Sequence, residues 1–184
     1  PTNYYGFTKL ETEEFIQWYG RLKGIRYVLL RYFNVAGDAG LHYVDQNPGN
    51  LIPILMDVLT GHREALTIFG NDYPTRDGTC IRDYIDLNDL TEAHIKALTL
   101  DSDEIINLGT AHGLSVSEII RMVAKETGKK FSVHIGPRRS GDVATIVADF
   151  KKAHQLLGWQ PIVSAEAMIE SMWRAYSKRD DAQK

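Results

Sequence analysis

The sequence is poor in cysteine: Cys80 is the only one among 184 residues. A single cysteine excludes a disulfide within the chain and favours a reducing compartment, so we expect a cytoplasmic protein. Long apolar runs are also missing. No stretch approaches the roughly 20 apolar residues of a membrane-spanning helix, and we therefore expect no membrane partner.

An excess of basic charge is absent as well. The chain has 21 Lys and Arg against 24 Asp and Glu, a formal net charge of -3, and its basic residues are scattered. This balance gives no support to a nucleic-acid partner. Four of the histidines (His62, His94, His112 and His154) follow no spacing typical of metal ligands, so we predict no metal site.

What the chain does contain is an alternation of helical and strand-like segments. Hydrophobic residues make up 43% and charged residues 24%, which is typical of globular proteins of one sizeable domain or two small ones. Helices are predicted at 5–22, where Gly24 ends the helix, at 51–59 and 86–98, from the Ser115–Glu118 capping box to a stop at Gly128, and from 164 onward. Strands are predicted at 27–35, 66–70, 80–85, 104–110 and 131–135. The alternation predicts an α/β fold with a parallel sheet.

A tyrosine and a lysine stand one helical turn apart at the start of the chain. In YYGFTK, helical i, i+4 spacing places Tyr5 and Lys9 on one face, whereas Tyr4 has Thr8 at that spacing. An ammonium group favours a neighbouring phenolate, and a phenolate can take the proton of a sugar hydroxyl. Because Y-x-x-x-K also occurs by chance, the spacing alone does not decide between a catalytic pair and two surface residues.

Longer motifs point to a family. The chain carries P-x-N-x-Y-G-x-T-K, then LRYFNVAG, NLIP, LTIFGNDYPTRDGTCIRDYIDLNDL, INLGT and GPRRSGDVATIVAD. In this order, over nearly the whole chain, they resemble the extended short-chain dehydrogenase/reductase family, and within it the UDP-galactose 4-epimerases (UDP-glucose 4-epimerases). The resemblance implies the C-terminal part of an NAD-binding Rossmann-type fold plus a small α/β substrate domain. It also implies NAD as cofactor, a UDP-sugar substrate and a homodimer whose interface includes the Tyr5 helix.

The resemblance assigns roles near the reacting sugar carbon. It implies that Tyr5 is the acid/base and that Lys9 is its partner and binds the nicotinamide ribose. Tyr32 and Phe33 would lie against the nicotinamide, and Asn34 would reach substrate hydroxyls. Core packing at the end of a strand is the plain alternative for Tyr32 and Phe33.

The resemblance also assigns a nucleotide site. Arg82 and Arg139 match diphosphate-binding arginines, as suits their forked donors, although a lone arginine is more often a solvated surface residue. The other matches are Asn50 and Leu51 at the diphosphate, Thr67 and Phe69 at the uracil, and Asp142 at the ribose. Ile146 occupies a position at which the family gates the C2 substituent of the sugar. Because isoleucine is smaller than tyrosine, we hypothesise that UDP-N-acetylhexosamines are also accepted.

Two family elements are missing from the chain. It has no G-x-x-G-x-x-G turn, it lacks the serine or threonine that the family places upstream of the tyrosine to complete the catalytic group, and it starts at Pro1. We therefore expect the C-terminal half of a longer enzyme, inactive when isolated. Residues 1–50 would belong to the NAD-binding domain and 51–184 mostly to the UDP-sugar domain, with 86–110 returning to the Rossmann sheet of the NAD-binding domain.

The implied reaction is inversion at C4 through a transient 4-keto sugar that rotates between hydride loss and hydride return. A 4,6-dehydratase or a UDP-glucuronate decarboxylase is the nearest alternative, against which FGNDYPTRDGT favours the epimerase. A non-catalytic nucleotide-sugar-binding module is a third possibility. Retention of Tyr5 and Lys9 argues against it, since a binding module has no use for that pair.

Overall fold

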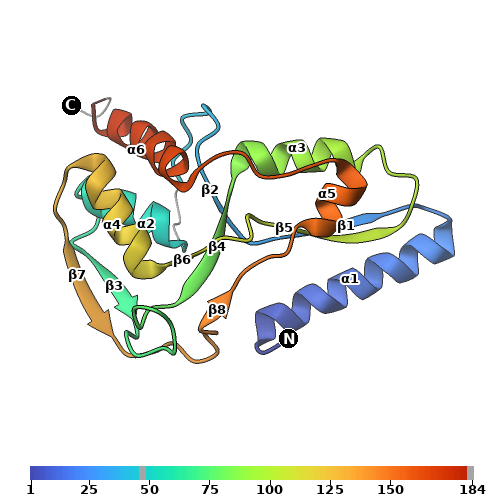
Figure 1. The fold of residues 1–184 in the computed structure, drawn as a ribbon, viewed down its shortest axis with the longest axis horizontal. Coiled ribbons are helices and arrows are strands. Elements are labelled where there is room, and N and C mark those ends of the chain that lie inside the picture. Colours follow the sequence, from blue (N-terminus) through green and yellow to red (C-terminus); the bar gives the residue numbers. More distant parts are fainter. Residues whose placement is uncertain (46–48, 182–184) are drawn as a thin grey trace.

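The computed structural model describes residues 1–45 and 49–181, with side chains up to Lys178 (Figure 1). The helices are α1 (Tyr4–Lys23), α2 (Leu51–Leu59), α3 (Leu87–Ala97), α4 (Val116–Thr127), α5 (Lys151–Leu157) and α6 (Ala165–Asp181). The strands are β1 (Val28–Tyr32), β2 (Asn34–Ala36), β3 (Ala65–Phe69), β4 (Ile81–Asp86), β5 (Glu104–Leu108), β6 (Gly113–Ser115), β7 (Ser132–Gly136) and β8 (Thr145–Ile146). Helices and strands alternate, so the predicted α/β class is confirmed. Within the described residues, no helix combines the length and apolar character needed to cross a membrane.

Helix α1 is defined by its caps rather than by burial. The Asn3 side chain accepts a hydrogen bond from the Gly6 N–H at 2.8 Å, and Gly24 ends the helix in the left-handed region at φ 65°. Gly20 is its only buried residue. An ion pair between Glu13 and Arg31 attaches the helix to β1. The helix therefore contributes little to a core, and its aromatic side chains are largely exposed.

The predicted strand 27–35 is wrong as a single element. It is interrupted at Phe33: β1 pairs in parallel with β5, whereas β2 pairs in parallel with β4. The continuous apolar run indicates burial, but it carries no information about which neighbour supplies the hydrogen bonds. The chain thus changes sheets within this segment, as can be followed in Figure 1.

Three short elements were not predicted. Strand β6 pairs antiparallel with β4, β8 pairs in parallel with the same strand, and α5 follows β8. Each is too short to show a periodicity of its own. The remaining pair, β3 and β7, is parallel, as the α/β pattern predicts.

The buried side chains form two hydrophobic clusters. The first cluster gathers α2, α4, α6 and β3, and the second gathers α3, α5, β1 and β5. Figure 1 shows these two groups of elements in opposite halves of the molecule, with β4 running between them. Strand β4 serves both, because Tyr84 packs in the first cluster and Ile85 in the second. The pairing of β1 with β5 is consistent with the predicted return of 86–110 to the Rossmann sheet, while the division into two domains stays a prediction.

Candidate functional site

Most of the predicted nucleotide-site residues line one cavity of about 340 Å³. They come from segments that are far apart in the sequence: the start of β2, the start of α2, β3, β4 and the loop before β8. The predicted residues on its wall are Asn34, Asn50, Leu51, Thr67, Phe69, Arg82, Arg139 and Asp142. The fold therefore brings together residues that the motifs marked only one by one.

Strand β3 and the loop before β8 form one part of the wall. The Arg139 guanidinium carbon lies 3.7 Å from the centre of the Phe69 ring, a close cation–π contact. Next to it, Arg138 is fixed by a 2.7 Å hydrogen bond from its Nε to Asp72 and by the Tyr73 ring. An arginine that contacts a ring in this way can still bind an anion through its N–H groups, and Arg139 lines the cavity.

Arg82 on β4 is held more firmly. Its Nη1 donates to the Val143 and Ile81 carbonyl oxygens at 2.7 and 2.9 Å, and its Nη2 lies 3.9 Å from an Asp142 carboxylate oxygen. The side chain is only 16% exposed. Because two carbonyls orient the guanidinium, Arg82 presents its charge to the cavity at little further entropic cost.

The start of α2 offers a different kind of anion site. Asn50 is the N-cap of α2, yet its side chain makes no capping hydrogen bond. The first N–H groups of the helix and the Asn50 amide are thus available where the helix dipole favours negative charge. Asn50 and Leu51 both line the cavity.

Sequence reasoning missed two polar residues of the cavity wall, Tyr84 and Arg63. Tyr84 follows Arg82 by two residues on β4, so strand alternation was a usable signal for it. Burial raises the pKa of Tyr84 to about 12, and Tyr84 is therefore a neutral hydrogen-bond donor or acceptor at physiological pH. Arg63 lies in the turn before β3, which no motif marked.

Cys80, to which no chemistry was assigned, also lines the cavity and is buried. Close to it, the Tyr73 hydroxyl is buried and has no hydrogen-bond partner among the described residues. Burial is the main cause of a raised Tyr73 pKa, with Cys80 as the next contributor. The tyrosine is thus a neutral, buried side chain of the loop 71–79.

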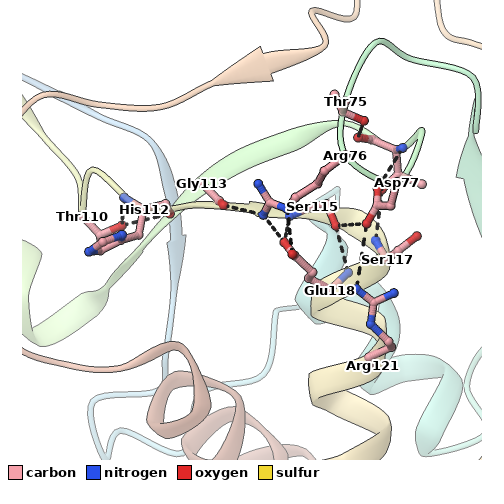
Figure 2. A network of polar contacts seen from close by, with 11 residues as sticks. Thr75, Arg76, Asp77, Thr110, His112, Gly113, Ser115, Ser117, Glu118 and Arg121 are labelled. Atoms are coloured by element: carbon pink, nitrogen blue, oxygen red, sulfur yellow. Dashed lines mark hydrogen bonds and ion pairs between the residues drawn. The ribbon is translucent and has the colours of Figure 1, made fainter.

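Polar contacts fasten that loop to the start of α4 (Figure 2). Asp77 accepts hydrogen bonds from the Ser115 hydroxyl and the Thr79 hydroxyl, while Arg76 forms a forked ion pair with Glu118. Ser115 and Glu118 also make the predicted capping box, with bonds of 3.0 and 2.8 Å. Since the loop leads directly into β4, the network fixes the strand that carries Arg82.

The predicted catalytic pair lies outside the cavity wall. Lys9 Nζ is 5.4 Å from the centre of the Tyr5 ring, so the two share a face of α1 as predicted. Tyr5 is 68% exposed. A methyl group at Gly141 would lie 3.5 Å from Asn3 Cβ, so the start of α1 lies against the loop that carries Arg139 and Asp142. The pair is consequently close in space to one end of the candidate site.

The remaining predicted residues are also outside the cavity wall. Tyr32 ends β1 half-exposed, with its ring 5.9 Å from that of His94, and Phe33 sits at the break between β1 and β2. Ile146 on β8 pairs with Arg82 on β4 and is 38% exposed. Their roles, like those of the cavity residues, stay predictions.

Comparisons with known proteins agree with the resemblance that the motifs indicate. Residues 1–172 match a family model described as GDP-mannose 4,6 dehydratase. The chain is 41% identical over 187 residues to a UDP-glucose 4-epimerase of Rhizobium meliloti, covering 98% of this chain and 57% of that protein. It is 45% identical over 181 residues to a UDP-glucose 4-epimerase of Halalkalibacterium halodurans, covering 94% and 54%.

The fold has close matches among solved structures. The UDP-glucose 4-epimerase from Bifidobacterium longum, in complex with NAD+ and UDP, superposes with a TM-score of 0.90 at 35% identity. That match covers 96% of this chain and 55% of the other. The chain thus spans about half the length of the proteins that it matches.

Proposed function

Since the chain belongs to the GDP-mannose 4,6 dehydratase family of nucleotide-sugar enzymes, we propose that it supplies the UDP-sugar site and the acid/base pair of a UDP-glucose 4-epimerase. The relatives named above carry that activity in their names. Because the chain spans about half their length, the reaction is proposed for the whole protein. The chain itself is proposed to bind the nucleotide.

The observation that carries this proposal is the convergence of Asn50, Arg82, Arg139 and Asp142 on one cavity. Two arginines and an uncapped helix start suit the two phosphate groups of a UDP-sugar. A ring such as Phe69 suits a flat base, and a carboxylate such as Asp142 accepts hydrogen bonds from ribose hydroxyls.

We propose NAD as the cofactor, held in part by Lys9, Tyr32 and Phe33. The fit rests on the exposure of Tyr5 and Tyr32 and on Lys9, which forms no ion pair with a carboxylate in the part of the chain that the structure describes. NAD, when bound, supplies reversible acceptance of a hydride from the sugar C4. An ammonium without a carboxylate partner is free to favour the Tyr5 phenolate and to bind ribose hydroxyls.

In the proposed reaction, Tyr5 removes the proton from the 4-hydroxyl and returns a proton after the keto sugar has rotated in the site. The arginines hold the diphosphate throughout, so the sugar can rotate without release. Asn34, on the cavity wall, is proposed to contact sugar hydroxyls.

Calorimetry with the 184-residue chain tests the binding step. We expect UDP to bind and the Arg82→Gln and Arg139→Gln variants to bind it at least tenfold more weakly, as for a lost charge-assisted hydrogen bond. Arg26→Gln, which alters an exposed pair with Asp101, serves as the control. Absence of UDP binding by the folded chain would contradict the proposal.

Incubation with UDP-galactose and NAD tests the chemistry. The chain contains no G-x-x-G-x-x-G turn, so we expect no turnover by the chain alone and epimerisation by the whole protein. Formation of UDP-glucose indicates an epimerase, whereas a 4-keto-6-deoxy product indicates the dehydratase alternative named by the family model.

We further propose that Ile146 widens the sugar site enough for UDP-N-acetylhexosamines. Ile146 pairs with Arg82 across two neighbouring strands, and this proximity to a proposed diphosphate contact supports a place for Ile146 near the sugar end of the ligand. In the whole protein, Ile146→Tyr is expected to lower turnover of UDP-N-acetylgalactosamine and to spare UDP-galactose. Equal effects on both substrates would contradict the gating role.

A homodimer is proposed as well. The exposed side chains of Phe15, Trp18 and Leu22 form an apolar face on α1 that suits burial against another helix. Sedimentation of the whole protein and of a Trp18→Glu variant tests this, with a shift to monomer expected for the variant.

A further inference from the structure

A third arginine, Arg63, lines the cavity beside Arg82 and Arg139. It lies in the turn between α2 and β3, and its backbone N–H donates to the Asp57 carbonyl oxygen at 3.1 Å. The His62 N–H donates to the same oxygen at 2.9 Å. The turn is therefore fixed to the end of α2, while the Arg63 side chain is exposed at the rim of the cavity.

Arg63 differs from most arginines of this chain in its surroundings. Arg31, Arg76, Arg138 and Arg174 each face a carboxylate. Within residues 1–45 and 49–178, the Arg63 side chain has no carboxylate at ion-pair distance and no hydrogen-bond acceptor. An arginine that lines a cavity without a protein partner has its donors available for a ligand.

The charges of the cavity wall do not balance. Its described lining residues include three arginines but only one carboxylate, Asp142, which lies near Arg82. Arg63 and Arg139 are thus left without a compensating negative charge in the lining. A diphosphate that joins a nucleoside to a sugar carries one negative charge on each phosphate group, and two such charges match the excess.

We propose that Arg63 is a third cationic contact for the diphosphate of the nucleotide ligand. The inference rests on the proposed nucleotide-sugar function and adds to it a binding residue that no motif marks. Since Arg63 is exposed, its contribution depends on ionic strength, in contrast to that of the largely buried Arg82.

Calorimetry with UDP, and competition of uridine against UDP, tests the assignment on the 184-residue chain. The variants are Arg63→Gln, Arg63→Lys and, as a matched control on α6, Arg174→Gln. For Arg63→Gln we expect about a tenfold rise in the Kd of UDP at low salt, as for one exposed charge-assisted hydrogen bond. The rise shrinks at high salt, and the affinity for uridine does not change. Arg63→Lys recovers part of the loss, and Arg174→Gln binds UDP like the unaltered chain.

The outcomes separate this inference from the function on which it rests. Unchanged UDP binding by Arg63→Gln overturns the Arg63 contact and leaves the proposed function standing. An equal loss for UDP and uridine also overturns it, because the contact would then be with the nucleoside. If the folded, unaltered chain binds no UDP, both proposals fall. Circular dichroism identifies a variant that fails to fold, and Arg63→Lys then decides the question.

Discussion

Asp83 offers the sharpest test of how the cavity wall is supported. Its carboxylate is fully buried on β4 and accepts four hydrogen bonds. One oxygen accepts from the Thr110 N–H and hydroxyl at 2.9 and 2.7 Å, and the other accepts from the Ala111 and Ala148 N–H groups at 3.1 Å each. One side chain thus joins β4 to the turn after β5 and to the segment after β8.

The cost of removing this carboxylate follows from the donors that lose their acceptor. In Asp83→Ala, the Thr110 and Ala148 N–H groups are left without a partner, while exposed Ala111 can turn to water. At roughly 1–3 kcal/mol for each unsatisfied buried donor, we expect a loss of about 4 kcal/mol in the free energy of unfolding. Asp83→Asn keeps one acceptor oxygen. The Thr110 hydroxyl already lies 3.2 Å from the His112 carbonyl oxygen, so it can donate there and accept a hydrogen bond from the new amide. Only one N–H is then lost, at a cost of about 2 kcal/mol.

Urea denaturation at pH 7, followed by circular dichroism, measures both variants. Asp101→Asn is the control, because that carboxylate is 89% exposed, and we expect no measurable change for it. The reasoning is refuted if Asp83→Ala is as stable as the control, or if Asp83→Asn costs as much as Asp83→Ala.

Three further predictions concern the supports of the fold. The hydrogen bond from Arg76 is the main cause of a lowered pKa of Glu118. The resulting stability is present above the unfolded pKa of about 4.3 and is lost as the pH falls through the folded value, so Glu118→Gln should flatten the decline in urea midpoint below about pH 5. Gly78→Ala, at φ 79° against a backbone carbonyl of its own loop, should lower the thermal midpoint more than Gly128→Ala, at φ 65° in open space. Trp159→Phe removes a 2.8 Å hydrogen bond from the buried indole to a carbonyl of α3 and should cost about 1–2 kcal/mol in urea denaturation; an unchanged midpoint would contradict the role of that bond.

Local chemistry explains what could be predicted of the fold. Gly24 marked the end of α1 and the Ser115–Glu118 box marked the start of α4, because these signals lie within a few residues of the feature they control. The break at Phe33 could not be predicted in this way. It depends on which of two distant strands pairs with each half of the segment, and pairing is a property of the whole sheet.

The candidate site also contains residues that the sequence could predict and one that it could not. The family motifs marked Asn50, Arg82 and Arg139, and the structure places all three on one cavity. Arg63 stood in no motif, and its position on the wall depends on the turn that joins α2 to β3. The family and the α/β class are confirmed, whereas the roles of individual residues await the binding experiments above.

The alternation of side chains along β4 determines which substitutions this strand can tolerate. Cys80, just before the strand, and Arg82 and Tyr84 within it line the cavity. Asp83 and Ile85 alternate with them: Asp83 accepts its four hydrogen bonds in the interior, and Ile85 packs in the second cluster. Tolerance to substitution should therefore alternate along the strand, and it should be higher at Arg82 than at Asp83 or Ile85. A change at Arg82 should alter ligand binding while the fold is kept, whereas a change at Tyr84 should affect both the cavity and the first cluster. Changes at Asp83 or Ile85 should destabilise the fold itself. The ligand preference of the cavity can thus change through Arg82, whereas Asp83 beside it has to be kept for the fold.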